Sequence, residues 1–474
     1  MPGHAEGCKM HFIQRFNVHL NVHPNLLLWV LVFLITTLII LLVQLVLLPL
    51  VFPAWHAGGG LLVGGDWLNF HEKAVVVAER IDSYGWSAWE LRPKGWLPTG
   101  ISAAVYAITW PEPWTMAPIN AALQATTFLV VMKLLLLFTD NRKLALIAAI
   151  PFAFFPSAML WYTQIHRDSY YILGIVLFIY GFLLTARLGQ HEKFEIRGII
   201  YLLCGLIIIW LVRPHSLDIF FYTTLLLSIV IAAAFAFMSG KSTVTRKQFF
   251  LKLLSLVLIV IFIYPLKETQ GALKYLNIPE AVNHIAMGEE TDPAEADAIH
   301  HWQRSAWLPE SVDNRLYSVA YLRSVSFPAR FGEAASSIDF DVSFHSAEDF
   351  VRYLPRALQV AFLAPFPADW FSEGGHASTS FFRRISAFEM LFVYLMLAAL
   401  AYGFWLWRKK IEFYILILFC AIMMMPIVYG VPNVGTIYRY RYGYLMLLVS
   451  LGVIAISRLI LKWRRSSKPG ERLK

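Results

Sequence analysis

Long apolar runs recur along this 474-residue chain and constrain its fold more than any other feature. A run of roughly 20 apolar residues crosses the hydrocarbon core of a bilayer as a helix, because a helix satisfies its own backbone hydrogen bonds there. Hydrophobic residues make up 58% of the chain and charged residues only 15%, which excludes an ordinary soluble protein. We predict spans at 25–52, 117–138, 143–162, 169–187, 198–212, 218–238, 249–265, 386–407, 412–430 and 442–461. The sequence therefore predicts an all-α polytopic membrane protein with about ten transmembrane helices.

Lysines and arginines gather in alternate short connections between these runs, and this pattern predicts the orientation. The basic connections hold Arg142 and Lys143, Lys193 and Arg197, Lys241, Arg246 and Lys247, and Arg408, Lys409 and Lys410. Since short cytoplasmic loops carry an excess of Lys and Arg, we predict that both termini are cytoplasmic and that the chain lies in the plasma (bacterial inner) membrane. The net charge of +9 is explained by these topology signals, so nucleic acid is not a predicted partner.

This orientation divides the chain into membrane modules and two large extracytoplasmic loops. The predicted parts are a cytoplasmic tail 1–24, a membrane module 25–265 with a first outer loop 53–116, an outer loop 266–385, C-terminal helices 386–461 and a basic cytoplasmic tail 462–474. Segment 98–111 is apolar but too short to cross comfortably, so we interpret it as re-entrant or interfacial. Chemistry is expected in the two outer loops.

Asp66 follows two glycines just beyond the first span. A flexible turn there places a carboxylate at the outer membrane surface, near lipid head groups and water, which suits a general base. The simpler alternative is an N-cap for the helix that begins near Trp67, because Asp is a favoured capping residue. The two roles are compatible.

Four arginines are predicted at outer ends of spans: Arg167, Arg213, Arg439 and Arg441. Positive residues are normally scarce at such junctions, so this group indicates a shared anionic ligand such as a lipid phosphate or pyrophosphate. Asp168 would orient Arg167 on that ligand. Ion pairs with Asp66, Asp168 or Asp218 would explain some of the arginines without a ligand.

No familiar cofactor motif is evident. The histidines His4, His11, His19 and His23 are irregularly spaced and lack a Cys or carboxylate framework, and His300–His301 reads as a loop feature. The chain lacks a nucleotide-binding glycine loop and a zinc-protease helix motif. We predict no metal ligands, and a divalent-cation requirement stays open.

The order of these features resembles the GT-C superfamily of membrane glycosyltransferases, which includes protein O-mannosyltransferases and the aminoarabinose transferase that acts on lipid A. The resemblance covers the first half best: one span, then an outer loop with Asp66, Phe70, Glu72 and Ala74, then Pro98 opening an apolar stretch. Phe155–Ser157 before Arg167–Ser169, and Asn433–Thr436 before Arg439, are similar to bacterial membrane proteins of polysaccharide clusters. The chain departs by lacking a paired acidic motif at Asp66 and a separate soluble C-terminal domain.

The resemblance implies that Asp66 is catalytic. We assign substrate binding to Glu72, Arg167, Asp168, Arg213, Arg439 and Arg441. The implied reaction transfers a sugar from a polyprenyl-phosphate-linked donor to a glycan, lipid or protein acceptor at the outer face of the membrane. The alternatives are a lipid-linked glycan polymerase or ligase, and a transporter or flippase for lipid-linked or anionic substrates. Ionisable residues at helix ends, rather than deep in the spans, favour the enzyme.

Overall fold

The computed structural model describes residues 24–186, 196–238, 246–268, 301–374 and 377–466. Nearly all of its regular structure is helical, and the described residues form one small sheet, the antiparallel hairpin of β1 (His56–Gly58) and β2 (Leu61–Leu62). The mainly apolar helices of the bundle are α2 (Pro24–Leu42, continued by a π-helix Val43–Val51), α5 (Ala117–Leu135), α6 (Arg142–Phe154), α7 (Pro156–Thr163), α8 (Arg167–Ala186), α9 (Ile196–Val212), α10 (Leu217–Met238), α11 (Arg246–Glu268), α17 (Ala377–Leu406), α18 (Ile411–Gly430) and α19 (Val434–Ser466). Shorter or amphipathic helices are α3 (Asp66–Tyr84), α4 (Leu97–Ile108), α14 (Glu310–Tyr321), α15 (Phe327–Phe331) and α16 (Ala347–Leu363).

Eight helical segments of the described chain are long and apolar enough to cross a membrane, which confirms the all-α polytopic class. Helices α6 and α7 meet at a bend of 61° and together make a ninth candidate. The bend follows from Pro156, because a proline disfavours helical backbone in the residue before it, and Phe155 is extended. Helix α9, the fifth predicted span, has only 17 residues. The total of ten spans therefore stays a prediction.

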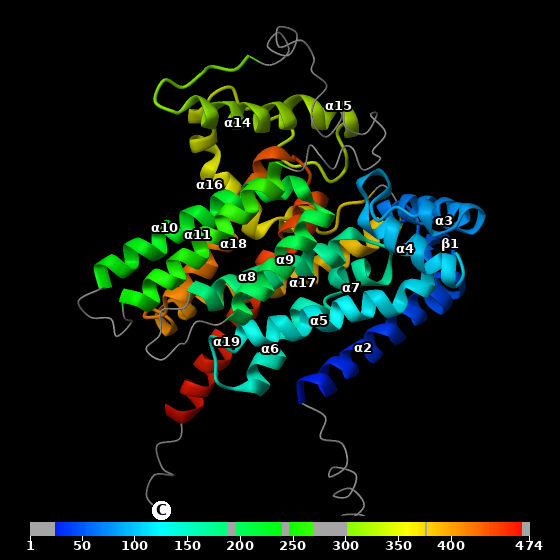
Figure 1. The fold of residues 1–474 in the computed structure, drawn as a ribbon, viewed down its shortest axis with the longest axis horizontal. Helices are drawn as coiled ribbons and strands as arrows, with labels where there is room; N and C mark the ends of the chain where they lie inside the picture. Colours follow the sequence, from blue (N-terminus) through cyan, green and yellow to red (C-terminus); the bar gives the residue numbers. More distant parts are fainter. Residues whose placement is uncertain (1–23, 187–195, 239–245, 269–300, 375–376, 467–474) are drawn as a thin grey trace, which may run out of the picture.

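Segment 98–111 forms the 12-residue helix α4, which is too short to cross a bilayer at 1.5 Å per residue. It packs against α3, whose buried face carries Phe70, Ala74 and Val77. Gly100 allows close contact with the preceding loop, since a Cβ there would lie 2.0 Å from the carbonyl oxygen of Leu91. Helices α3 and α4 thus form a small unit beside the bundle (Figure 1).

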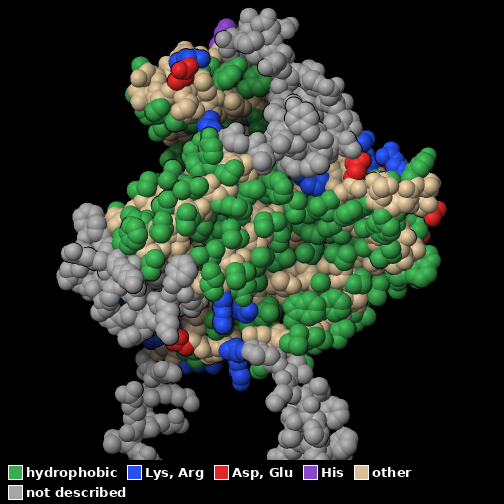
Figure 2. Space-filling model, in the orientation of Figure 1, with side chains coloured by type: hydrophobic (Ala, Val, Ile, Leu, Met, Phe, Trp, Pro, Cys, Tyr) green, Lys and Arg blue, Asp and Glu red, His purple; other side chains and the backbone are tan. Residues whose placement is uncertain are grey.

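The helix bundle has two ends with different contacts. At one end, which we call the basic end, the indole of Trp407 donates to the carbonyl of Phe138 (3.0 Å), Lys410 donates to Leu137 (3.0 Å), and Arg458 donates to the hydroxyl of Thr139 (3.0 Å). Helices α3, α4, α14, α15 and α16 lie toward the opposite end (Figure 1). Hydrophobic side chains cover the middle of the visible face, and most charged side chains lie near its upper and lower edges (Figure 2). This distribution suits a protein embedded in a bilayer.

Arg323 anchors the described residues 301–374, between α11 and α17, to the bundle. Its guanidinium donates to the carbonyls of Val428 at the end of α18 (3.0 Å) and of Val342 (2.8 Å). Asp339 accepts two hydrogen bonds from Arg356, each 2.9 Å long. These contacts place α14 to α16 over one end of the membrane helices.

Two helices begin eight or nine residues earlier than the sequence predicts. Helix α17 starts at Ala377 rather than 386, and α19 starts at Val434 rather than 442. Asn433 caps the start of α19 by accepting a hydrogen bond from the backbone of Thr436 (3.0 Å), an interaction that favours helix initiation there. As a result, Arg439 and Arg441 lie inside α19 rather than before it.

Candidate functional site

Asp66 is the first residue of α3, and Gly65 occupies the N-cap position. The N-cap alternative for Asp66 is therefore wrong, and its carboxylate is available to other partners. Its Oδ2 accepts a hydrogen bond from Nη2 of Arg439 at 3.3 Å and lies 3.9 Å from Nη2 of Arg167. The Asp66 side chain is 45% exposed, so a ligand can reach it.

Asp168 lies at the centre of the same cluster and is buried. Its Oδ2 accepts a hydrogen bond from Nε of Arg439 at 3.0 Å, and its Oδ1 accepts one from Nη2 of Arg213. Arg439 thus bridges the two carboxylates, although it is separated from Asp66 by 373 positions in the sequence. We define the charged cluster as Asp66, His166, Arg167, Asp168, Arg213 and Arg439.

Close packing of α8 against α9 brings Arg213 to Asp168. Gly205 of α9 faces α8 so closely that a Cβ would lie 2.5 Å from the backbone nitrogen of Phe178. Small residues at such a contact let two helix backbones approach each other. Arg213 follows the last residue of α9, and its guanidinium lies 3.7 Å from the ring centre of Tyr440 and 4.7 Å from that of Tyr171. This aromatic contact holds the cation in place.

His166 belongs to the cluster and was missed at the sequence level. Its Nδ1 lies 3.1 Å from the backbone nitrogen and 3.2 Å from Oδ2 of Asp168. Burial lowers the pKa of His166 and outweighs the opposite effect of Asp168, so the ring is neutral at neutral pH. Its Nε2 is buried without a hydrogen-bond partner among the described residues. The sequence signal was its position directly before Arg167–Asp168.

Two residues assigned to substrate binding lie away from the cluster. Glu72 is exposed on α3, and its charge acts on the adjacent His71 and Lys73. Arg441 is buried and donates to the carbonyls of Val360 (2.7 Å) and Ala361 (2.6 Å). The prediction that Arg441 lies with the other arginines is therefore wrong. Successive residues turn around a helix axis by about 100°, so Arg441, two residues after Arg439, points to nearly the opposite side of α19.

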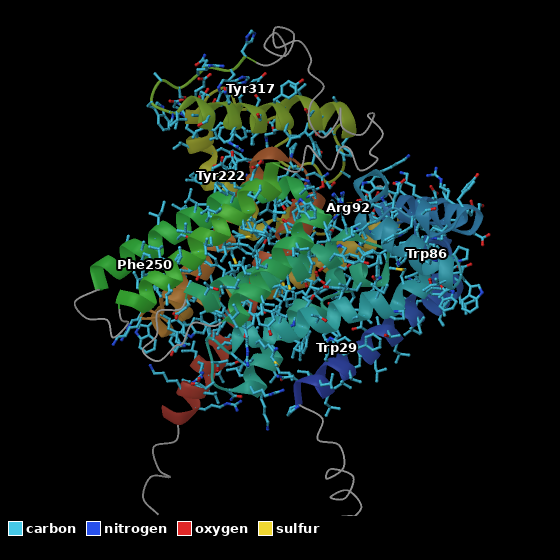
Figure 3. All side chains as sticks on the ribbon, viewed as in Figure 1. Trp29, Trp86, Arg92, Tyr222, Phe250 and Tyr317 are labelled. Atoms are coloured by element: carbon cyan, nitrogen blue, oxygen red, sulfur yellow. The ribbon has the colours of Figure 1, made fainter. Side chains whose placement is uncertain are left out.

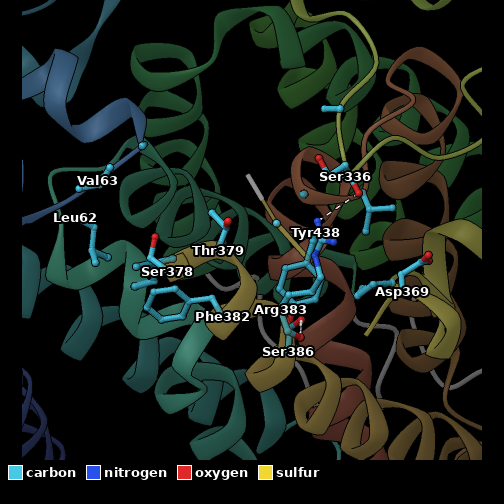
Figure 4. Close-up of a pocket in the computed structure, with 18 of the residues that line it drawn as sticks. Leu62, Val63, Ser336, Asp369, Ser378, Thr379, Phe382, Arg383, Ser386 and Tyr438 are labelled. Carbon is cyan, nitrogen blue, oxygen red and sulfur yellow. Dashed lines mark hydrogen bonds between the residues drawn. The ribbon is translucent and has the colours of Figure 1, made fainter. Parts of the chain in front are cut away.

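A cavity of about 630 Å³ lies beside the charged cluster and has a mainly apolar lining (Figure 4). Segments from both predicted outer loops and from α19 contribute to it, through Leu62, Trp67, Ser336, Phe382, Arg383 and Tyr438. Trp67 lies between the cavity and the charged cluster, because it lines the cavity and its ring centre lies 6.0 Å from that of His166. Tyr438, which directly precedes Arg439, donates a hydrogen bond to the buried Glu389 at 2.7 Å.

Within the described ranges, no group of three or more His, Cys, Asp or Glu side chains is placed to hold a metal ion. Arginines engage the two carboxylates of the cluster instead. The histidines His4, His11, His19, His23 and His300 lie outside the described residues. The arrangement is suited to binding an anion.

No protein-family model matches the sequence, and no curated protein or solved structure matches this chain. Its function is therefore argued from the site itself.

Proposed function

We propose that this chain is a GT-C-like membrane glycosyltransferase, which transfers a sugar from a polyprenyl-phosphate-linked donor to an acceptor at the outer face of the plasma membrane. The observation that carries the proposal is the set of contacts in the charged cluster. Asp66 lies beside Arg167 and Arg439. Arg439 and Arg213 both bind the buried carboxylate of Asp168. A carboxylate and several guanidinium groups are the parts that such a transfer needs. They come from the first outer loop and from the ends of α8, α9 and α19.

The arginines would act on the leaving phosphate. In the reaction, the acceptor oxygen forms a bond to the anomeric carbon while the bond from that carbon to the phosphate oxygen breaks. Negative charge then builds on the phosphate, and guanidinium groups already in position stabilise it without reorganising. One such charge-stabilising donor in a poorly hydrated site contributes about 3 kcal/mol to lowering the barrier.

Asp66 would take the proton from the acceptor hydroxyl. Burial by itself would raise the pKa of Asp66, but the charges of Arg439 and Arg167 outweigh this effect and lower it, so the carboxylate is ionised at neutral pH. A bound phosphate would share the charge of both arginines, and the pKa of Asp66 would then rise. The base would thus become stronger when the donor is in place, which couples proton transfer to donor binding.

The cavity supplies the apolar surface that a lipid-linked substrate requires. Most of its lining is apolar, and it lies next to the charged cluster across Trp67. An isoprenoid chain in contact with this surface would be removed from water while its phosphate reached the arginines. A polymerase or ligase of lipid-linked glycans would use the same parts and would differ in the acceptor.

The test replaces Asp66 by Asn and measures sugar transfer from a polyprenyl-linked donor in membranes. Loss of a general base should reduce the rate by a factor of about 10² to 10⁴. Asp82→Asn is the matched control, since Asp82 is exposed on the same helix. Full transfer by Asp66→Asn at normal expression would rule out the proposed mechanism, and translocation of the lipid without transfer would favour a transporter.

A further inference from the structure

The end of α16 and the turn that follows it receive hydrogen bonds from two membrane helices. The hydroxyl of Tyr394 on α17 donates to the carbonyl of Leu363 at 2.6 Å. Arg441 of α19 donates to three more carbonyls, those of Val360, Ala361 and Ala364. The last carbonyls of a helix have no partner within the helix, and in water they can bond to solvent. Donors from the protein are required where water is absent, as it is in the hydrocarbon core of a bilayer.

The position of Tyr394 on α17 shows how far this turn lies from the basic end. Tyr394 precedes the last residue of α17, Leu406, by twelve residues, which is about 18 Å along the helix axis. Leu406 is followed by Trp407, which contacts Phe138 at the basic end. The hydrocarbon core of a bilayer is about 30 Å thick. The carbonyl of Leu363 therefore lies within the depth of the core.

The two flanks of this turn lie near the outer ends of the same helix bundle. The carbonyl of Phe350, in the first turn of α16, accepts a hydrogen bond from the hydroxyl of Tyr429 at 2.9 Å, one residue before the end of α18. Arg383, in the second turn of α17, donates to the carbonyl of Glu373 at 2.9 Å. The chain thus descends along α16, turns after Leu363 and returns by Glu373. We call residues 350–373 the hairpin.

The charged residues of the hairpin follow this change of depth. Arg352 and Arg356 lie in the first part of the hairpin, and the next charged residue is Asp369. Residues 357–368, which include the turn, contain one polar side chain, that of Gln359. A charged side chain is costly in hydrocarbon, so the deepest part of the hairpin has the composition that a lipid environment requires.

Helix α16 has an exposed apolar stripe that no other described part of the chain covers. Val351, Leu354 and Leu358 are exposed at the spacing of one helix face. On α17, Leu391 and Leu395 are also exposed, on either side of the tyrosine that contacts the turn. The stripe and these leucines form apolar surface at the depth of the membrane helices, and acyl chains are the partner that fits such a surface.

We propose that the hairpin is re-entrant: it enters the bilayer from the side opposite the basic end and contacts the acyl chains of that leaflet through the stripe of α16. Non-helical backbone is tolerated at this depth where protein covers it, and Ala364 and Pro365 in the turn are buried. Pro365 also lines the cavity. The hairpin therefore forms part of the cavity wall and places that wall at the depth of lipid tails.

The experiment measures the surroundings of the stripe in the full-length protein in lipid nanodiscs. Leu358→Cys, in a background without native cysteines, carries a bimane fluorophore. The two quenchers are phosphatidylcholine with a doxyl group on its acyl chain and iodide in the water. We expect the doxyl lipid to quench this label. Quenching by iodide should be at least about tenfold weaker than at a position in water, because an ion is excluded from hydrocarbon.

Val312→Cys on α14 is the matched control, since Val312 and Leu358 are both 41% exposed. Figure 3 shows α14, marked by Tyr317, above Tyr222, which lies in the second turn of α10. Helix α14 therefore lies beyond the outer end of a membrane helix. The label at position 312 should be quenched by iodide and not by the doxyl lipid.

Leu354→Cys, one turn from Leu358 on the same stripe, gives the same measurement if the first variant does not fold. Equal quenching by iodide at positions 358 and 312 would overturn the proposal and place the stripe in water. Weak quenching of position 358 by both reagents would also overturn it, because a protein surface, such as a second copy of this chain, would then cover the stripe. The measurement uses no sugar donor, so its outcome is independent of the proposed function.

Discussion

Arg439 and Arg441 lie two residues apart on α19 and have different surroundings. Arg439 is 28% exposed and contacts two carboxylates at the candidate site. Arg441 is 1% exposed, and the backbone carbonyls of Val360, Ala361 and Ala364 accept its hydrogen bonds. Both residues are cations at one end of a predicted span, but Arg439 belongs to the charged cluster and Arg441 connects α19 to the end of α16.

Replacing Arg441 by Ala should destabilise the protein, whereas replacing Arg439 by Ala should mainly weaken phosphate binding. The first change removes the Arg441 donor from the buried carbonyls of Ala361 and Ala364, at a cost of about 1–3 kcal/mol for each. The second leaves Asp168 paired with Arg213. Thermal unfolding and gel filtration of the detergent-purified variants would measure the difference. An Arg441→Ala protein that is stable but unable to transfer sugar would restore Arg441 to substrate binding.

At the scale of elements, the contact between α8 and α9 determines the geometry of the cluster. Gly174 and Gly181 on α8 face Gly205 and Gly198 on α9, and each pair is spaced by seven residues. A spacing of seven residues puts the two glycines of each helix on the same helix face, two turns apart. The antiparallel backbones of α8 and α9 can therefore approach closely at both positions. Arg213 at the end of α9 is thereby fixed beside Asp168 at the start of α8.

Gly205→Ala should lower stability by about 1–3 kcal/mol, because the added methyl group has no room. Its Cβ would lie 2.5 Å from the backbone nitrogen of Phe178. Gly443→Ala is the control, since the nearest atom there is 3.4 Å away on the side chain of Ile175. Thermal unfolding would give the stability, and the rate of sugar transfer would show whether the charged cluster is disturbed. Equal behaviour of the two variants would mean that the α8–α9 contact tolerates separation.

At the scale of the whole molecule, the basic end and the charged cluster lie at opposite ends. The basic end holds Arg142, Lys410 and Arg458, and the charged cluster lies where α8 and α19 begin. Positive residues flanking short loops favour the cytoplasmic side. The same helices therefore place the charged cluster on the side predicted to face away from the cytoplasm.

This arrangement predicts the labelling of single cysteines by a membrane-impermeant reagent. In a background without native cysteines, Ser87→Cys in the loop after α3 should react in intact cells. Asp140→Cys, at the basic end, should react only after permeabilisation. Both positions are exposed, so accessibility within the protein does not separate them. Labelling of position 140 in intact cells would reverse the predicted orientation and place the site in the cytosol.

The amino-acid sequence by itself determined the class of this protein and most of its candidate chemistry. Apolar runs in a bilayer have few alternatives to the helix, because lipid offers no partner to backbone polar groups. Asp66, Arg167, Asp168, Arg213 and Arg439 were all identified from charge at the predicted helix ends, and the structure brings them together. The early start of α19 was missed, since Arg439 and Arg441 interrupt the apolar pattern before residue 442.

Only the tertiary structure decided which of these groups meet. Local sequence does not separate Arg439 from Arg441, because the direction of each side chain depends on how α19 is rotated against its neighbours. His166 carries no distinctive local motif, and its relevance comes from the partners that packing places around it. The cavity likewise requires segments from the first outer loop, the second outer loop and α19. Proximity between residues hundreds of positions apart is a property of helix packing, which local periodicity and charge do not encode.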